Sequence, residues 1–260
     1  MFTHFKFAIV VLLASVALAP VAAQRPQEAK QKNAVEPKKM EAGGGWIQLF
    51  DGKTLNGWRG YKKPDATSTR WKVETGLLTI PGTGEGDTHG QRDLITDATF
   101  DQFDLRWEWK ISQGGNSGVK YFVLEDRDAA IGHEYQMIDD EGHADAKIGP
   151  HRQTAAFYDV LPAHDRPMKP AGEWNTSEVI VKGKHVTHIL NGKNVLKYNL
   201  DSPELKAAIA KSKFKDIERF GKLQNGHILL QDHGDQVWYR KIEIKRLSPA
   251  TTTTTGAQKQ

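Results

Sequence analysis

The sequence predicts an all-β protein made of two antiparallel sheets with one short helix. Between residues 45 and 247 the chain divides into many short strand-like runs separated by turn residues, a spacing typical of a β-sandwich or barrel. Only one segment has a convincing helical pattern. Because a parallel sheet needs a helix at nearly every crossover, the strands are expected to pair antiparallel.

The clearest single strand is "FDLRWEWKIS", residues 103–112. Successive side chains of a strand point to opposite faces of the sheet. Phe103, Leu105, Trp107 and Trp109 therefore share one face, and charged residues occupy the other. This strict alternation predicts a strand with one buried and one polar face.

A hairpin is expected over "HVTHILNGKNVLKYNL", residues 185–200. Asn191-Gly192 stands between two strand-like runs, and this dipeptide suits a two-residue type I′ turn. Further strands are expected in "EWNTSEVIVKG" before the hairpin, and in "GHILLQDHG" and "VWYRKIEIKRL" near the end.

The single helix is predicted just after the hairpin. Ser202 can cap its N-terminus and Pro203 suits its first position. Leu205, Ala208 and Ile209 form a short apolar stripe, which one side of the helix can bury.

Both ends of the chain are predicted to lie outside the folded domain. "MFTHFKF", an apolar run and "VAAQ" predict a signal peptide over residues 1–23, and residues 24–44 predict a disordered linker. Residues 45–247 form the predicted domain, and residues 248–260 a low-complexity tail. The apolar run is shorter than the roughly 20 residues of a spanning helix, so no stable membrane insertion is expected.

Composition narrows the classes of function. The chain has no Cys, which excludes a lipid-linked lipoprotein and a disulfide scaffold. Its formal charge of +4 comes from the predicted signal, linker and tail, so residues 45–247 are neutral. A neutral domain lacks the basic surface of a nucleic-acid binder. No nucleophile elbow or phosphate loop is present either.

Three stretches combine ionisable and aromatic residues. In "GGNSGVKYFV", residues 114–123, simple alternation puts Lys120 and Phe122 on one strand face. Either these two side chains line a binding cleft, or the Lys120 stem lies on apolar neighbours with its ammonium group in water.

The second stretch is "IGHEYQMIDDEGHADAK", residues 131–147. Alternation places Tyr135 and Met137 toward the core, so Glu134 and Gln136 point either into a cleft or to solvent. The following loop contains several oxygen and imidazole donors that could hold a divalent cation, or it is a solvated acidic loop. These donors include Asp139, Asp140 and His143.

The third stretch is "LLQDHGDQVWYR", residues 229–240. Gln231 and His233 share one face of the predicted strand, and Leu230 and Asp232 share the other. His233 is a candidate acid or base because its ordinary pKa, about 6.5, is near neutrality. The alternative is a histidine that only completes a hydrogen bond at the strand end.

Six motifs in one unbroken order resemble the 3-keto-disaccharide hydrolase domain family, over about residues 45–247. They are "WIQLFDGKTLNGWRG", "WKVETGLLTI", "GGNSGVKYFV", "GHEYQMIDDEGHADAK", "KPAGEWNTSEVIVKGKHVTHILNGKNVLKYN" and "GHILLQDHGDQVWYRKIEIKRL". The resemblance implies a concanavalin A-like jelly-roll β-sandwich that a bacterium exports to the periplasm or the medium. It also implies cleavage of glycosides whose sugar is oxidised to a ketone at C3.

Laminarinase-type enzymes on this fold carry two carboxylates in a Glu-x-Asp-x-Glu strand. Here the nearest strand reads Glu134-Tyr135-Gln136-Met137-Ile138, without the second carboxylate. A C3 ketone offers a different route, in which one base removes the C2 proton and a donor holds the C3 oxygen.

The hypothesis assigns roles to the candidate residues. Glu134 or His233 is the base, Lys120 stabilises the enolate oxygen, and Gln136 orients a hydroxyl. A divalent metal on Asp139, Asp140 and His143 could replace Lys120 in that role. Phe122, Trp58 and Asp232 are expected to contact the sugar. The alternatives are a carbohydrate-binding module or lectin, and an ordinary glucanase.

Overall fold

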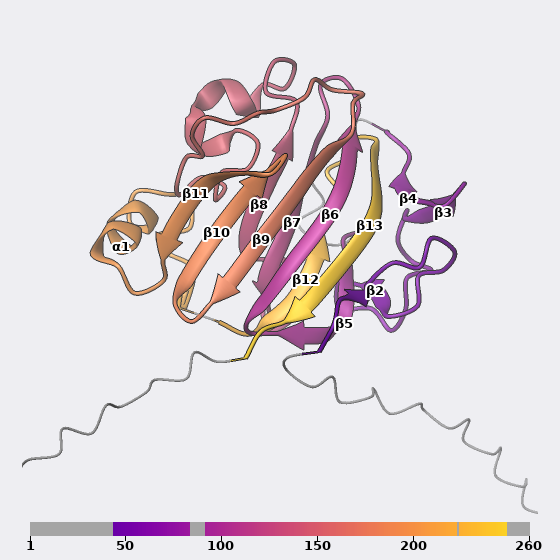
Figure 1. Cartoon of the computed structure of the whole chain (residues 1–260), viewed down its shortest axis with the longest axis horizontal. Helices are drawn as coiled ribbons and strands as arrows, with labels where there is room; N and C mark the ends of the chain where they lie inside the picture. Colours follow the sequence, from indigo (N-terminus) through magenta and orange to yellow (C-terminus); the bar gives the residue numbers. More distant parts are fainter. Residues whose placement is uncertain (1–43, 84–91, 223, 249–260) are drawn as a thin grey trace, which may run out of the picture. The chain divides into compact units, whose positions relative to one another are not determined.

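The computed structural model describes residues 44–83, 92–222 and 224–248. The predicted signal peptide, nearly all of the predicted linker, and the tail beyond residue 248 lie outside the described residues. Two antiparallel sheets lie one behind the other, which confirms the predicted all-β jelly-roll sandwich (Figure 1).

The larger sheet has eight strands, in the order β11-β10-β9-β6-β13-β4-β3, with β1 paired to β13. Its strands are β1 (Ile47–Gln48), β3 (Lys72–Glu74), β4 (Leu77–Ile80), β6 (Phe103–Ile111), β9 (Asn175–Lys182), β10 (His185–Leu190), β11 (Lys193–Asn199) and β13 (Val237–Arg246).

The smaller sheet has five strands, in the order β2-β5-β12-β7-β8. Its strands are β2 (Trp58–Gly60), β5 (Leu94–Phe100), β7 (Asn116–Val123), β8 (His133–Ile138) and β12 (Gly226–Leu230). Two short 3₁₀ helices follow β8, at Asp145–Ile148 and Pro150–Arg152.

Local sequence patterns account for several of these elements. The inward residues of β6, from Phe103 to Trp109, are buried in strict alternation, as predicted. Asn191 and Gly192 join β10 to β11 and have φ values of 47° and 80°, the positive pair that a type I′ turn needs.

The predicted helix is α1 (Pro203–Ile209), which is the only α-helix among the described residues. The Ser202 side chain accepts a hydrogen bond from the Leu205 amide at 3.1 Å, and Leu205 is buried. No helix in the described part of the chain is both long enough and apolar enough to cross a membrane.

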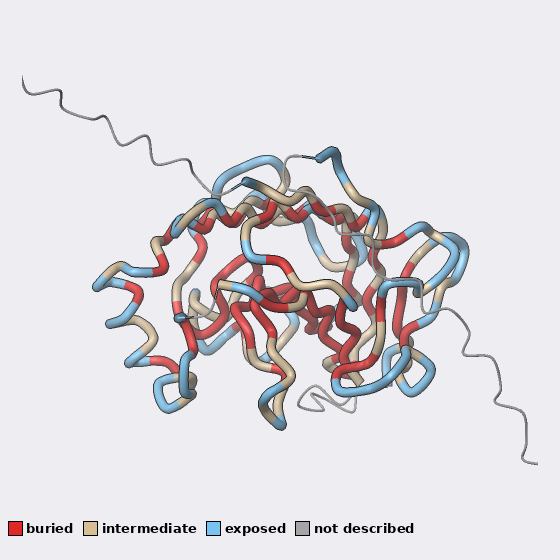
Figure 2. Tube along the Cα trace, turned by 90° about the horizontal axis from the view of Figure 1, so that it is seen from below, coloured by how far each residue is buried: buried red, intermediate tan, exposed pale blue. Residues whose placement is uncertain are grey.

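The hydrophobic core lies between the sheets, and exposed residues gather in the connections (Figure 2). Buried residues alternate with less buried ones along β6, β9 and β10. Strands β7 and β8 differ from these three, because every residue in both is buried. Both of their faces are therefore covered, one by the larger sheet and the other by loops. The second face carries the candidate site.

Candidate active site

A pocket of about 470 Å³ lies on the face of the smaller sheet that points away from the core. Strands β7 and β8 form its floor, and residues following β12 form one side. The remaining wall of the pocket is formed by loop residues 129–132, 158 and 213–217. Its lining comprises Asn116, Lys120, Ala129, Ala130, Ile131, Gly132, Glu134, Gln136, Tyr158, Lys213, Phe214, Ile217, Gln231 and His233.

Lys120 and Glu134 form a buried ion pair on the pocket floor. They are directly opposite each other on β7 and β8, and Lys120 Nζ lies 3.8 Å from Glu134 Oε2. Lys120 Nζ also donates to the Ala130 carbonyl at 3.2 Å. A buried ion pair needs such additional hydrogen bonds to offset the loss of hydration.

A glycine on β7, diagonally across from Glu134, makes room for the carboxylate. A Cβ atom at Gly118 would lie 2.7 Å from Glu134 Oε1, closer than real contacts allow. Gly118 is on β7, where it pairs with Gln136, the residue two positions after Glu134. The carboxylate can therefore lie over the β7 backbone only because this position has no side chain.

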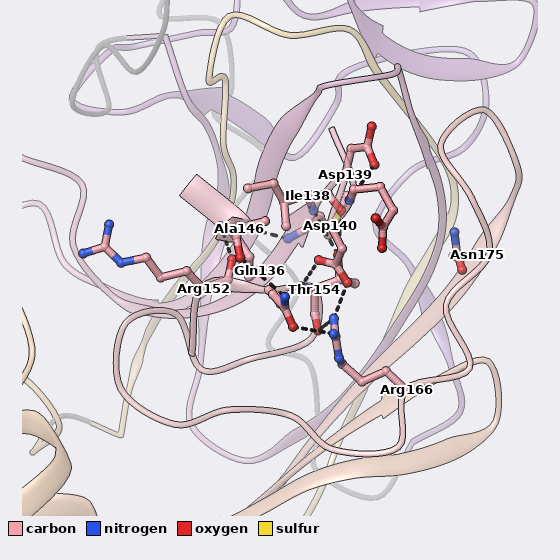
Figure 3. A network of polar contacts seen from close by, with 12 residues as sticks. Gln136, Ile138, Asp139, Asp140, Ala146, Arg152, Thr154, Arg166 and Asn175 are labelled. Atoms are coloured by element: carbon pink, nitrogen blue, oxygen red, sulfur yellow. Dashed lines mark hydrogen bonds and ion pairs between the residues drawn. The ribbon is translucent and has the colours of Figure 1, made fainter. Parts of the chain in front are cut away.

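Gln136 lies on the same face but its amide is engaged. Its Oε1 accepts from the Met137 amide at 3.1 Å, and its Nε2 approaches the Arg152 carbonyl at 3.5 Å (Figure 3). The residue is almost completely buried. Its place in the pocket lining agrees with the predicted direction of the side chain.

His233 borders the pocket and lies close to two further donors, Asp235 and His143. Its Nδ1 lies 3.8 Å from Asp235 Oδ2, and its ring centroid is 5.8 Å from that of His143. Asp235 Oδ2 also accepts from the Asn116 amide at 2.9 Å, which ties the cluster to β7. Burial lowers the pKa of His143, and the nearby His233 lowers it further.

The predicted metal ligands do not come together. Asp139 accepts from the Gly114 and Glu141 amides. Asp140 accepts from the Thr154 amide at 2.8 Å and from Arg166, as Figure 3 shows. Both carboxylates thus hold loops in place.

The described residues contain one group of three donors that could hold a metal ion, and it combines His143 with His233 and Asp235. The predicted loop contributes His143 to this group, whereas Asp139 and Asp140 do not belong to it. Asp235 was overlooked, although it follows His233 by two positions in the same motif.

Phe122 does not share a face with Lys120, which corrects the predicted position. Lys120 pairs with Leu229 and Val123 with His227, so β7 has one residue more than β12 between these pairs. This β-bulge, with Phe122 at φ 60°, turns the phenyl ring into the core. There it packs against Phe103, Tyr121 and His133.

Trp58 and Asp232 are also outside the pocket lining, contrary to the prediction. Trp58 is buried in the core, and its indole N–H donates to the Leu49 carbonyl. Asp232 is fully buried and accepts two hydrogen bonds from Arg70, at 2.9 and 2.5 Å. Arg70 is far away in the sequence, so no local pattern could reveal this ion pair.

Sequence reasoning missed the far wall of the pocket. Tyr158 comes from the loop before β9, and Phe214 and Ile217 come from the segment after α1. Tyr158 O–H donates to Asp145 at 2.8 Å, and burial raises the pKa of the phenol. Neither loop has a periodic pattern that would place it over the smaller sheet.

Comparison with known proteins identifies the family of this chain. The model of the 3-keto-alpha-glucoside-1,2-lyase-like domain matches residues 45–245. The chain belongs to this family. A 3-keto-disaccharide hydrolase of Bacteroides thetaiotaomicron is 39% identical over 229 residues, covering 78% of this chain and 79% of the relative.

Two crystal structures from Parabacteroides distasonis, both named as a putative glycosyl hydrolase, resemble this lyase-like domain. One has a TM-score of 0.70 at 30% identity, and covers 78% of this chain and 94% of its own. The other has a TM-score of 0.62 at 28% identity, with coverages of 78% and 100%. The prediction of a glycoside hydrolase is confirmed at this level, while the oxidised sugar and the roles of individual residues stay predictions.

Proposed function

We propose that this lyase-like domain cleaves glycosides that carry a ketone at C3 of the sugar, starting with removal of the C2 proton. The decisive observation is the composition of the pocket floor. Among the described lining residues Glu134 is the only carboxylate, and it lies 3.8 Å from Lys120. Ordinary glycoside hydrolysis uses two carboxyl groups that flank the scissile bond.

A C3 ketone removes the need for a second carboxylate. It acidifies the C2 hydrogen, so a base can take this proton and form an enolate. The enolate then expels the C1 oxygen substituent, which leaves as an alcohol after protonation. Water adds across the resulting C1–C2 double bond and gives the free 3-keto sugar. One base and one donor at the C3 oxygen suffice for this sequence.

Glu134 is the proposed base and Lys120 the proposed donor to the C3 oxygen. Both side chains are nearly excluded from solvent, and electrostatic interactions are stronger in such surroundings than in water. Lys120 carries a positive charge where the enolate develops a negative one. His233 is the second candidate for the base, because it borders the same pocket.

The names of the family and of one relative both support elimination followed by hydration. The family is described by a lyase reaction and the Bacteroides relative by hydrolysis of a 3-keto disaccharide. Elimination followed by hydration contains a lyase step and yields the products of hydrolysis. The proposed mechanism therefore agrees with both descriptions.

The test measures release of a chromogenic aglycone from a 3-keto-glucoside and from its unoxidised parent. Wild-type protein should cleave only the oxidised compound. Glu134→Gln should lower kcat about 100-fold or more, which is the usual size of a general-base effect. Glu204→Gln, on an exposed face of α1, is the matched control and should retain full activity.

Wild-type rates in Glu134→Gln would overturn the assignment of the base, and a large loss in His233→Ala alone would transfer it to His233. Reaction in D₂O separates the two routes of cleavage. Elimination and hydration place solvent deuterium at C2, whereas direct hydrolysis does not. Binding of unmodified glycans without turnover of keto sugars would instead favour a carbohydrate-binding module.

We also propose that the chain is exported. The segment that supports export comprises residues 1–23, whose basic start, apolar run and small-residue site suit a signal peptide. N-terminal sequencing of the protein from the periplasm or medium of its bacterium should find Gln24 first. A mature protein that retains Met1 would contradict cleavage.

A further inference from the structure

We propose that His143, His233 and Asp235 bind one divalent transition-metal ion at the rim of the active-site pocket, with an open coordination position toward the substrate. The inference rests on the proposed function only for the role of the ion, since the site itself follows from geometry. One ligand atom from each residue lies within 4.8 Å of those from the other two.

Two separate loops bring the three side chains together. His143 follows β8, whereas His233 and Asp235 lie between β12 and β13. At metal–ligand distances of about 2.1 Å, two ligand atoms are about 3 to 4 Å apart. The 3.8 Å between His233 Nδ1 and Asp235 Oδ2 already falls in this range, and small side-chain shifts would bring in His143.

The donor set indicates which metal fits. Calcium and magnesium prefer sites made of oxygen atoms, whereas two imidazoles and one carboxylate suit zinc, cobalt, manganese or iron. Three protein ligands leave a position open, as catalytic metal sites do. Because His233 belongs to the pocket lining, a substrate oxygen in the pocket can reach an ion held there.

The surroundings of the three residues favour binding. All three are half-buried, so the ion would be partly shielded from water. Asp235 is held by the Asn116 amide at 2.9 Å, which fixes the carboxylate without neutralising it.

One hydrogen bond must change when the ion binds. His143 Nδ1 accepts from the Asp145 amide at 3.0 Å, so in the metal-free form this nitrogen has no proton. If Nδ1 binds the ion, the ion replaces the Asp145 N–H. If Nε2 binds the ion, the ring proton moves to Nδ1. Nδ1 can then no longer accept the hydrogen bond from the Asp145 N–H. In both cases the Asp145 amide loses its acceptor.

A bound ion would complement the proposed chemistry. When present, it would polarise the C3 carbonyl as a Lewis acid and share with Lys120 the charge that develops on that oxygen. His233 would then be a ligand, and Glu134 would remain the base. The metal site therefore assigns different roles to the two candidate bases.

The experiment uses tag-free mature protein that has been dialysed against a chelator. Zn²⁺ and Co²⁺ are titrated by calorimetry, and the metal content is measured after gel filtration. We expect one ion per chain, and faster hydrogen exchange at the Asp145 amide on loading. His143→Ala, His233→Ala and Asp235→Asn should each weaken binding about 100-fold or more.

His185→Ala serves as the matched control, because His185 is exposed at the start of β10 and away from the cluster. It should bind Zn²⁺ as tightly as wild type. Substoichiometric binding, or equal affinity in the three site variants and the control, would overturn the proposal. Circular dichroism of each metal-free variant confirms that loss of binding does not come from unfolding.

Activity distinguishes failure of this inference from failure of the proposed function. Cleavage of 3-keto-glucosides at an unchanged rate by protein that binds no metal would overturn the metal site alone. Stoichiometric binding without cleavage of any keto sugar would overturn the function and leave the site intact. Restoration of activity by Zn²⁺ or Co²⁺ in dialysed wild type, but not in Asp235→Asn, would support both.

Discussion

At the scale of single residues, the pocket floor depends on which side chains are absent as well as present. Lys120 and Glu134 carry the charges, but Gly118 leaves the space in which the carboxylate lies. The motif "NSGVKYFV" thus contains both a charged group and the gap that its partner needs. The lysine is recognisable as a candidate site residue from the sequence alone. The role of the glycine becomes clear only from its contact with Glu134 on the neighbouring strand.

Gly118→Ala should therefore impair activity far more than stability. The new methyl group would displace the flexible end of the Glu134 side chain, which can move at little cost in folding free energy. Because small misplacements of a catalytic group are costly, we expect kcat to fall about 100-fold with a nearly unchanged Tm. Gly45→Ala, with no atom within 4 Å of the new Cβ, is the control. Unchanged kcat in Gly118→Ala would contradict the placement of Glu134 as the base.

At the scale of elements, alternation predicts faces until a bulge interrupts it. Strand β6 follows the period of two along its whole length, so its buried face could be predicted from the sequence. Strand β7 follows it only to Tyr121, because the following residue is the extra one relative to β12. The bulge depends on the register with another strand, which the sequence of β7 does not contain. Simple alternation therefore predicts Phe122 in the pocket, whereas the side chain lies in the core.

Substitution of one phenylalanine in the core and one in the pocket wall distinguishes the effects of the two locations. Phe122→Ala should reduce the free energy of unfolding by about 3 to 5 kcal/mol, the usual cost of truncating a buried phenylalanine. Phe214→Ala, in the pocket wall, should be less destabilising but raise KM for the keto sugar. Urea unfolding and steady-state kinetics measure both effects. If Phe122→Ala raises KM at unchanged stability, the phenyl ring faces substrate after all.

At the scale of the whole molecule, a chain of hydrogen bonds connects the two sheets through the core. His133 Nδ1, the hydroxyls of Tyr198 and Tyr121, and His188 Nε2 are hydrogen-bonded in series, at 3.0, 2.6 and 2.9 Å. With both rings neutral and His188 Nδ1 facing a carbonyl, Tyr121 donates to His188, Tyr198 to Tyr121 and His133 to Tyr198. His188 Nδ1 then donates to the Ala155 carbonyl. All members are neutral, and this pattern has no acceptor for an added proton at His188 Nε2.

Acid should therefore destabilise the fold through these histidines. Burial lowers the pKa of His133 to about 3 and that of His188 to about 4, whereas unfolded histidines titrate near 6.5. Below pH 6.5 the unfolded chain binds more protons than the folded one. The free energy of unfolding consequently falls as the pH drops from 6.5 to about 4, by up to about 1.4 kcal/mol per pH unit for each histidine.

Urea unfolding between pH 7 and pH 4.5 tests this dependence. His188→Gln removes one of the two titrating groups, so its stability should decline less steeply with falling pH than that of wild type. His185→Gln, at an exposed position on the same strand, should keep the wild-type slope. Equal slopes for wild type and His188→Gln would show that the buried histidine is not responsible.

The sequence by itself determined the elements whose causes are local. Alternating apolar residues specified β6, two residues with positive φ specified the turn between β10 and β11, and a serine cap with a following proline specified α1. The same alternation directed Lys120, Glu134 and His233 toward one surface. Each of these features depends on backbone preferences and burial within a few neighbouring residues.

Only the tertiary structure decided which distant residues meet. Pairing of β7 with β12 created the bulge at Phe122, and folding brought Arg70 to Asp232, and His143 to His233 and Asp235. The pocket wall came from loops that have no periodic pattern. Such contacts depend on strand register and loop path, which are set by packing of the whole domain. Local sequence therefore determined the charged residues of the pocket floor. Packing of the whole domain determined which loops and side chains lie around them.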